Sequence, residues 1–479
     1  MNLVATHIAL VGLHLPPQLA LFLTLAFIVF LFRRDIRERP NVSGALWLPL
    51  IWLVFTCSRP FSEWLRIFGL PVSGGASNEA GSPVDASFFY AMVTAGFCVL
   101  IKRQISLSEV LRRNGWLVAF IAYCFISVLW SDYPFISFKR ATKIFGHPIM
   151  ALIVLTEPDF EEALRRLMKR CAYVVVPVSI LWIRYFPHLG TSYPDEWSGM
   201  QVVNGISVGK NGLGEDCLLL GFFFFWHLLQ TWRTERNTQR RNELWLIAGF
   251  LLGILYLLRL SHSATAAICL FVAILLVVFV GIRPTIKNFI GTYMLTALVL
   301  LVAAQLAFGI SGQLSESLDR GSGMSGRADL WARCLEFQSD PILGKGFEGF
   351  WFPEKRNQIA AFYHGWRPGG AHNSYLDLYL ELGLIGLSIL IGLLVATFWK
   401  IRHDLFRDFE WGRYRLGLLA AVALRGWTET CFTPGSAIWF VFYIIAMEYP
   451  LTYLTTARPS VGVARSEESR EFAYAEEEL

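Results

Sequence analysis

The sequence predicts an all-α fold, a polytopic membrane helix bundle of about 12–13 transmembrane helices with one long outer loop. Two observations support this fold class. Of the 479 residues, 54% are hydrophobic and only 16% are charged, which excludes an ordinary soluble domain. Apolar runs also recur along the whole chain, and most approach the roughly 20 residues that an α-helix needs to cross a bilayer.

Thirteen apolar runs are the expected membrane helices. Between two of them, the segment 157–170 has helical spacing and is expected to lie along the inner membrane surface as an amphipathic helix. The expected membrane helices lie near residues 8–32, 43–57, 86–101, 115–130, 141–156, 171–186, 212–230, 244–260, 264–282, 289–309, 375–399, 416–431 and 436–454.

Basic residues set the expected orientation of this bundle. The connecting segments 33–39, 102–113, 157–170 and 231–243 each carry four Lys or Arg residues. The positive-inside rule places such segments in the cytoplasm. The alternation of helices then places the long loop at 310–374 on the outer face.

We expect one membrane domain at residues 1–456, followed by a charged, disordered cytoplasmic tail at 457–479. The formal net charge of +5 mostly reflects the cytoplasmic anchors, so a nucleic-acid partner is not expected. The eight Cys are scattered without a C-x-x-C pair, and only Cys334 lies well inside the outer loop. Neither a disulfide framework nor a metal site is therefore predicted.

The outer loop holds the first candidate catalytic residues. Most connecting loops have only about 4–6 residues, whereas this one carries GRADLW at 326–331, DPILGKG at 340–346 and AHNSYL at 371–376. His372 precedes Asn373, a good helix N-cap, and then a long apolar helix. A helix N-terminus disfavours imidazolium, so His372 is a candidate general base. The alternative is an interfacial His that hydrogen-bonds a lipid headgroup or a loop carbonyl.

Arg327, within GRADLW, is the second candidate. A guanidinium grips phosphate oxygens in a two-pronged geometry and would stabilise a pyrophosphate leaving group. Arg320 precedes it by seven residues and is a further candidate for binding the same anion. A surface Arg beside anionic lipid is the alternative interpretation, most of all for Arg320 and Arg333.

Other basic and polar residues lie at the expected outer ends of helices. Lys210 and Asn211 occur in GISVGKNGLGED, which departs from a P-loop but still starts a helix where an anion can bind. Arg140 follows the WSDYP segment, where the alternative is snorkelling to lipid phosphate. Arg259 lies at the end of one apolar run just before the SHSAT turn, which predicts a polar cavity there. Asn373 completes the candidate substrate-binding set.

Asp377 and Glu381 share one face of the helix that follows His372. A pair of carboxylates could act in glycoside chemistry, but Asp377 lies in the first helical turn, where the helix dipole alone favours it.

These motifs together resemble the O-antigen ligase and polymerase superfamily of bacterial membrane proteins. The resemblance covers roughly residues 115–400, and the KN and S-x-S-A-T elements resemble the exopolysaccharide production polymerases of the ExoQ type. The motifs that carry it are WSDYP at 130–134, GKNGLG at 209–214, SHSATA at 261–266, GRADLW, DPILGKG and AHNSYLDLYLELGLIGL at 371–387.

The resemblance implies an inverting glycosyl transfer, without metal or cofactor, on the periplasmic face of the bacterial inner membrane. The donor would be an oligosaccharide on undecaprenyl pyrophosphate, and membrane lipids, a flippase and chain-length regulators are candidate partners. By motif position, His372 corresponds to the family's essential His and Arg327 to a conserved loop Arg. Many ligases carry an Arg within the serine-rich turn; this chain has His262 there, and Arg259 is the candidate substitute.

Two other functions remain open at this point. An O-antigen ligase would use the same donor but a lipid acceptor. A transporter of lipid-linked glycans should place its ionisable residues near the membrane midplane in two related halves, whereas the candidates here gather at the outer mouth. The sequence therefore favours an enzyme.

Overall fold

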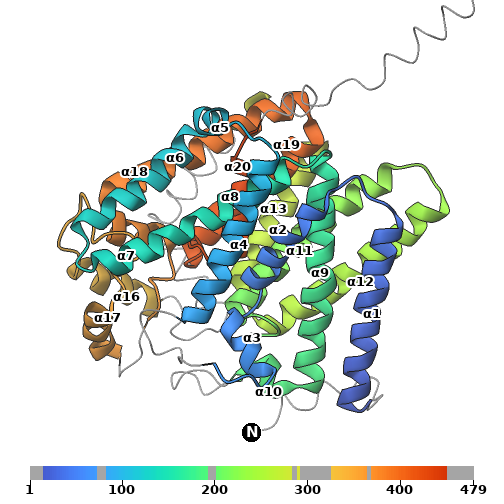
Figure 1. The fold of residues 1–479 in the computed structure, drawn as a ribbon, viewed down its shortest axis with the longest axis horizontal. Helices are drawn as coiled ribbons and strands as arrows, with labels where there is room; N and C mark the ends of the chain where they lie inside the picture. The colour runs from blue at the N-terminus through green and yellow to red at the C-terminus, as the bar shows by residue number, and fades with distance from the viewer. Residues whose placement is uncertain are drawn as a thin grey trace, which may run out of the picture.

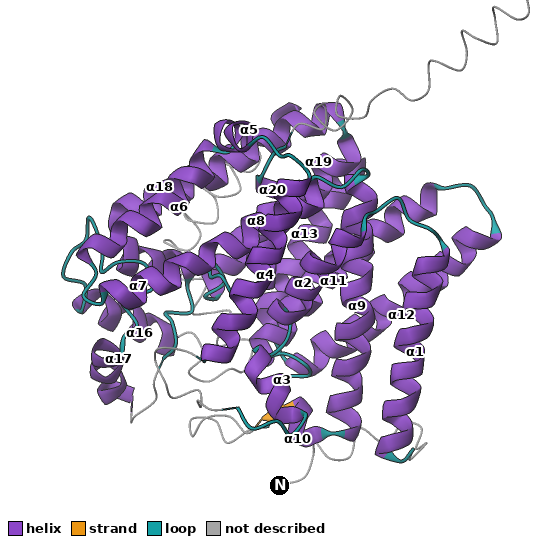
Figure 2. Ribbon diagram, in the orientation of Figure 1, coloured by secondary structure: helices purple, strands orange, loops and turns teal. Residues whose placement is uncertain are grey.

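The computed structural model describes residues 15–72, 82–192, 201–282, 288–291, 325–363 and 368–449. Over these residues the chain is a bundle of α-helices with one short antiparallel strand pair, β1 with β2 (Figure 1, Figure 2). The predicted all-α membrane bundle is confirmed. The tail at 457–479, Arg320 and nearly all of the helix expected at 289–309 lie outside the described residues.

The described elements follow in chain order, with short 3-10 helices marked η. They are α1 (Pro17–Arg37), η1 (Gly44–Leu46), α2 (Trp47–Thr56), α3 (Phe61–Ile67), α4 (Pro83–Lys102), α5 (Leu107–Arg113), α6 (Gly115–Ile126), η2 (Ser127–Trp130), α7 (Pro134–Ala141), η3 (Thr142–Phe145), α8 (Gly146–Leu155), α9 (Phe160–Tyr185), α10 (Pro187–Gly190), β1 (Thr191–Ser192), β2 (Val202–Val203), α11 (Lys210–Arg233), α12 (Thr238–Ser261), α13 (Ala264–Ile282), α16 (Ser325–Glu336), α17 (Pro353–Ala360), η5 (Ala361–Tyr363), α18 (Ser374–Arg407), α19 (Phe409–Thr428) and α20 (Ala437–Ala446).

Within the described residues, five helices are long and apolar enough to cross a membrane: α4, α11, α12, α13 and α18. The number rises to seven if two bent pairs each count as one span, α2 with α3 and α5 with α6. These numbers are lower than the 12–13 expected, because several apolar runs form short or bent helices and one run lies mostly outside the described residues.

Helix α9 differs from the expectation at its start. The segments 157–170 and 171–186 were predicted as a surface helix and a separate span, but they form one continuous helix from Phe160. Arg166 and Arg170 are buried there and each lies 2.7 Å from a different carboxylate oxygen of Asp35 on α1. Buried charges are tolerated when they are paired, so this basic half of α9 packs against α1 instead of lying along the membrane surface.

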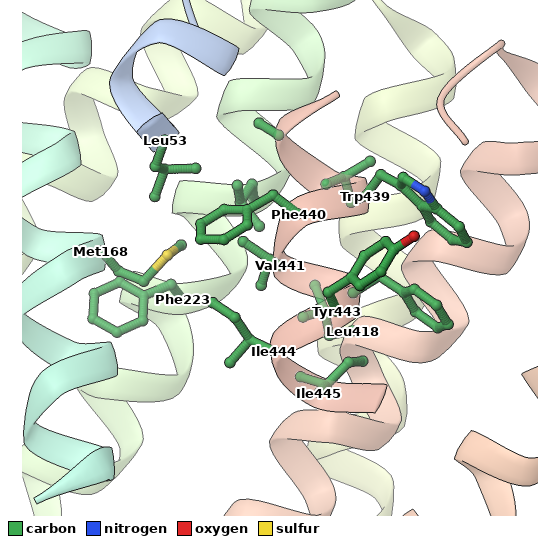
Figure 3. Packing of buried hydrophobic residues seen from close by; sticks show 14 of the residues in the cluster. Leu53, Met168, Phe223, Leu418, Trp439, Phe440, Val441, Tyr443, Ile444 and Ile445 are labelled. Atoms are coloured by element: carbon green, nitrogen blue, oxygen red, sulfur yellow. The ribbon is translucent and has the colours of Figure 1, made fainter. Parts of the chain in front are cut away.

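The core of the bundle surrounds α20. All ten residues of this helix are buried, and it packs against α8, α11 and α19. Figure 3 shows Phe440, Val441 and Ile444 pointing toward side chains of other helices, among them Met168 and Phe223. A ten-residue helix is about 15 Å long, half of a bilayer's hydrocarbon thickness. Helix α20 is therefore too short to cross a bilayer, and because all of its residues are buried, protein surrounds it on every side.

Helix α18 is interrupted once, and a loop motif packs into the interruption. Gly383 has a φ of +64°, which breaks the helix, and the freed backbone N–H of Leu384 donates to the Pro341 carbonyl at 2.9 Å. Gly344, with a φ of +73°, lies so close that a Cβ there would be 2.4 Å from the Glu381 carbonyl carbon. The backbone of the DPILGKG motif therefore packs closely against α18 at this break, a contact that we call the clasp.

The WSDYP segment and Ser127, which lies just before it, also contact the DPILGKG motif and the residue after it. Trp130 donates its Nε1–H to the Leu343 carbonyl at 3.2 Å, and the Phe347 N–H donates to Ser127 Oγ at 2.9 Å. Gly346 fits closely against Ser131, since a Cβ there would be 2.7 Å from the Ser131 Cβ. Two motifs that are about 200 residues apart in the sequence thus pack together beside the break of α18 at Gly383.

Candidate active site

His372 lies two residues before α18 in a strained backbone conformation. Its φ is +52°, which is uncommon for a residue other than Gly. The surrounding contacts hold this conformation. The Ala371 N–H donates to Asp377 Oδ1 and the Trp331 Nε1–H to the Ala371 carbonyl, both at 2.8 Å. On the other side, Asn373 Oδ1 caps α18 by accepting two backbone N–H groups of its first turn, at 3.0 and 3.2 Å.

The Glu429 carboxylate is the centre of the site. It lies directly after α19, and its side chain is only 7% exposed, against 35% for His372. His372 Nδ1 is 3.0 Å from Glu429 Oε2. On the other oxygen, Oε1 accepts from Asn211 Nδ2 at 2.9 Å and from an Arg327 terminal nitrogen at 3.0 Å. One carboxylate therefore joins three residues that the sequence predicted independently.

The charge of Glu429 decides how the imidazole is oriented. Burial acts to raise the pKa of Glu429, but the hydrogen bond from His372 and the positive charges of Arg425 and Arg327 outweigh burial, so this pKa is lowered. Glu429 is then an anion across the neutral range and can only accept hydrogen bonds. This assigns the proton of neutral His372 to Nδ1 and leaves Nε2 as the nitrogen that can take a proton.

Arg327 meets His372 at this carboxylate, and its guanidinium is already engaged by the protein. One terminal nitrogen donates to the Thr428 carbonyl at 2.9 Å and the other to Glu429 at 3.0 Å. These contacts use two of the five N–H donors that a guanidinium carries. Arg327 thus fixes Glu429 and still has donors to offer a ligand.

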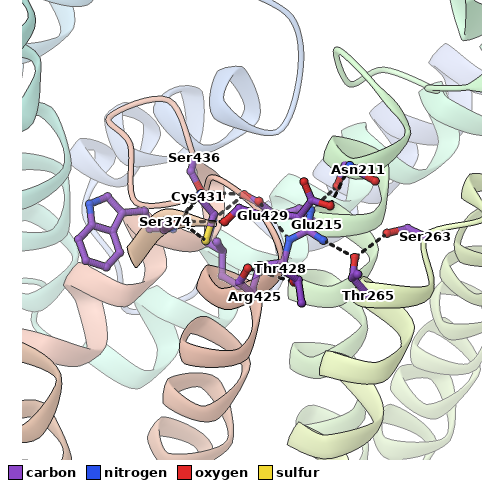
Figure 4. Close-up of polar contacts among 12 residues, drawn as sticks. Asn211, Glu215, Ser263, Thr265, Ser374, Arg425, Thr428, Glu429, Cys431 and Ser436 are labelled. Carbon is purple, nitrogen blue, oxygen red and sulfur yellow. Dashed lines mark hydrogen bonds and ion pairs between the residues drawn. The ribbon is translucent and has the colours of Figure 1, made fainter. Parts of the chain in front are cut away.

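A second, fully buried arginine supports the same network from α19. Arg425 is 1% exposed and donates to Thr265 Oγ1 at 3.0 Å and to the Asn211 carbonyl at 2.7 Å. Its Nε also lies 3.8 Å from Glu215. Figure 4 shows Arg425 between Thr265 of the SHSAT turn and the segment that contains Glu429. The cation that reaches the serine-rich turn is therefore Arg425.

A cavity of about 370 Å³ lies near the start of α18, and its lining includes Ser374 but not His372, Arg327 or Glu429. Gly369, Ser374 and Thr430, which flank His372 and Glu429 in the sequence, line part of it. The rest of its wall combines charged and aromatic side chains. Its charged lining residues are Lys139, Arg140, Lys143, Arg356, Glu348, Asp377 and Glu381. A volume in this range and convergent polar groups are typical of ligand sites.

The structure brings together some of the predicted binding residues and separates others. Asn211 contacts Glu429, Arg140 lines the cavity, and the Asn373 side-chain oxygen is occupied by its cap. Lys210 and Arg259 are exposed, and neither lines the cavity. In place of Arg259, Arg425 contacts the serine-rich turn.

Glu429 and Arg425 are the residues that sequence reasoning missed. Both fall in or beside the apolar run 416–431, which was interpreted as an ordinary membrane helix. The sequence did contain a signal for these two residues. An ionisable residue inside an apolar membrane run costs free energy, so such residues are usually functional.

A part of the chain that includes His372 matches a known protein family. Residues 247–391 match the O-antigen ligase family. The exopolysaccharide production protein ExoQ of Rhizobium meliloti (strain 1021) is 26% identical over 301 residues, a match that covers 59% of this chain and 64% of that protein. The expected resemblance to the O-antigen ligase superfamily is confirmed.

The O-antigen ligase match contains His372 and Arg327 but ends before Arg425 and Glu429. The GKNGLG segment with Asn211 lies before it. The part of the chain that matches the family therefore supplies the imidazole and one guanidinium, while flanking segments supply the carboxylate and the amide that bind them. The comparison supports an O-antigen ligase or polymerase type of membrane protein.

Proposed function

We propose that this protein is a glycosyltransferase of the bacterial inner membrane that polymerises undecaprenyl-pyrophosphate-linked oligosaccharide repeat units into exopolysaccharide on the periplasmic face. The observation that carries the proposal is the pair formed by His372 and Glu429, a ring nitrogen 3.0 Å from a buried carboxylate. A base oriented by a third group is the arrangement that activates a hydroxyl nucleophile. The matches to the O-antigen ligase family and to ExoQ support the choice of substrate class.

The proposed reaction is a single inverting displacement. His372 Nε2 takes the proton of an acceptor sugar hydroxyl, whose oxygen forms a bond to the anomeric carbon of the donor glycan. The bond from that carbon to the diphosphate oxygen breaks, and the lipid diphosphate leaves as an anion. Arg327 and the cations of the cavity, Arg140 among them, stabilise the growing negative charge. Metal ions have no role in this scheme.

The second candidate function is an O-antigen ligase that transfers the glycan to a lipid acceptor. The family match favours it as directly as it favours a polymerase. A transporter of lipid-linked glycans is disfavoured, because His372, Arg327 and Asn211 meet at one carboxylate, Glu429, and do not divide between two related halves. Flippase and chain-length regulator proteins are the proposed partners in the membrane.

His372→Ala tests the proposed base. We expect purified His372→Ala protein to bind the lipid-linked donor but to lose about 10²–10⁴-fold in kcat. Wild-type polymer yield at an equal protein level would reject the assignment. His188→Ala is the matched control, since His188 is exposed on α10.

The lipid-linked products of a deletion strain separate the two functions. Carriers that bear single repeats indicate a polymerase, whereas long, unattached chains on the carrier indicate a ligase.

A further inference from the structure

Helix α7 and the η3 turn after it have two chemically opposite faces. Lys139, Arg140 and Lys143 line the cavity near the start of α18, and all three fall within five consecutive residues of the chain. Arg356 on α17 adds a fourth cation to the same cavity wall. One short element therefore supplies most of the positive charge of the cavity.

The other face of this element carries exposed aromatic rings. The relative exposure is 79% for Phe135 and 51% for Phe138, and Phe145 is also exposed. Phe138 and Phe145 both stand against Phe125 of α6, with ring centroids 6.2 and 5.2 Å apart. An aromatic strip on α7 thus continues onto α6. Helix α6 in turn packs against α18, and Figure 1 shows α6, α7 and α18 near one another in the bundle.

The acidic residues of the cavity restrict where an anion can bind. Asp377 already accepts hydrogen bonds from Trp351, Ala371 and Thr430 at 2.5–2.8 Å, and Glu381 accepts one from the Glu348 N–H. Asp377 and Glu381 lie on α18, and the third carboxylate of the cavity, Glu348, lies 3.7 Å from Arg140 of α7. Lys139 and Lys143 are the other cations of the α7 wall, and they attract negative charge in a ligand.

We propose that α7 and η3 form the docking site for a polyprenyl diphosphate. Lys139, Arg140, Lys143 and Arg356 hold the diphosphate inside the cavity, and Phe135, Phe138 and Phe145 contact the first isoprene units outside it. The site rests on the proposed function for its ligand class, and it adds Lys139, Lys143 and Arg356 to Arg327 and Arg140 as cations that contact the diphosphate. A diphosphate and an isoprenoid chain joined end to end match an element with one basic and one aromatic face.

Binding without turnover tests the site. The protein in lipid nanodiscs is titrated with undecaprenyl diphosphate that carries no glycan, and separately with inorganic pyrophosphate. Lys143→Gln should weaken the binding of both ligands about tenfold, the change produced by one charge-assisted contact of ~1.4 kcal/mol. Phe138→Ala should weaken the binding of the lipid and leave inorganic pyrophosphate unchanged.

Matched controls remove the same groups elsewhere. Arg333→Gln deletes a partly exposed cation on α16, and Phe271→Ala deletes an exposed ring on α13; neither residue lines the cavity. Both controls should bind undecaprenyl diphosphate with wild-type affinity. Unchanged binding in Lys143→Gln, or equal weakening in Lys143→Gln and Arg333→Gln, overturns the proposal. Equal competition by an anionic phospholipid such as phosphatidylglycerol also overturns it, because it reveals a general headgroup site.

The test separates this site from the proposed function. If the wild-type protein binds undecaprenyl diphosphate as described but never extends a lipid-linked glycan, the glycosyltransferase proposal fails and the α7 site stands. If it extends glycans while Lys143→Gln and Phe138→Ala bind the lipid normally, the α7 site fails alone.

Discussion

Replacing Glu429 with Gln removes the charge at the centre of the site while keeping its shape. The carboxylate oxygen Oε1 accepts two hydrogen bonds, from Asn211 and Arg327, so the Gln oxygen is expected to take that position. The Gln amide then points its N–H toward His372 Nδ1, which must become an acceptor. The imidazole proton moves to Nε2, and the general base is lost. We expect kcat to fall by about 10²–10⁴-fold with little change in KM.

The assay is polymer formation by purified protein from a lipid-linked repeat unit, with kcat and KM measured separately. Glu429→Asp keeps the charge and should recover part of the activity, which a purely structural role would not predict. Glu336→Gln is the matched control, because Glu336 is exposed and pairs only with Arg333 among the described residues. A wild-type kcat in Glu429→Gln would refute the orientation of His372 by this carboxylate.

The lowered pKa of Glu429 also predicts how stability depends on pH. A carboxyl whose pKa is lower in the folded than in the unfolded protein adds stability above its unfolded value, about 4.3 for Glu, and loses it as the pH falls through the folded value. The melting temperatures of the wild-type protein and Glu429→Gln should therefore differ most at neutral pH and converge in acid. A difference that grows as the pH falls contradicts this sign.

Three further substitutions test other parts of the structure by melting temperature and activity. Gly344→Ala should lower the free energy of unfolding by more than ~1 kcal/mol, because this position needs a positive φ and the new Cβ would meet the α18 backbone. Gly249→Ala is the control and should not destabilise the protein, since Gly249 has open space around it. Equal melting temperatures of the two variants would contradict the close packing of Gly344 against α18. Arg425→Gln should lower the free energy of unfolding by about 3 kcal/mol, since it leaves the buried hydrogen-bond partners Thr265 and Asn211 unsatisfied. A wild-type melting temperature of this variant would contradict this expectation. Asn373→Ala should cost about 1 kcal/mol through the lost helix cap, and an unchanged stability with a raised KM would instead indicate that Asn373 binds substrate.

The sequence predicted the fold class and several residues of the candidate site for physical reasons. The hydrophobicity of an apolar run by itself indicates that the run is buried in lipid or protein, so membrane helices could be predicted without knowing which helices they contact. His372, Arg327 and Asn211 stand out locally, because each lies in a polar motif at a helix start or in a long loop. The structure places all three at Glu429.

What the sequence could not show is which residues meet across long separations. Glu429 binds Asn211, 218 positions away, and Arg327, 102 positions away. Lys210 is the neighbour of Asn211 but is exposed, since one step along a helix turns the side chain by about 100°. DPILGKG was notable as a motif, yet its role as a clasp on α18 depends on the break at Gly383.

The tautomer of His372 is the most direct test of this account. Protein with 15N-labelled histidine, measured by NMR at pH 8, gives the protonated nitrogen of each ring, and His372→Ala identifies the resonances of His372. The account predicts a proton on Nδ1 and none on Nε2, with the reverse in Glu429→Gln. A proton on Nε2 in the wild-type protein would contradict it, because the nitrogen that must accept the hydroxyl proton would already carry one.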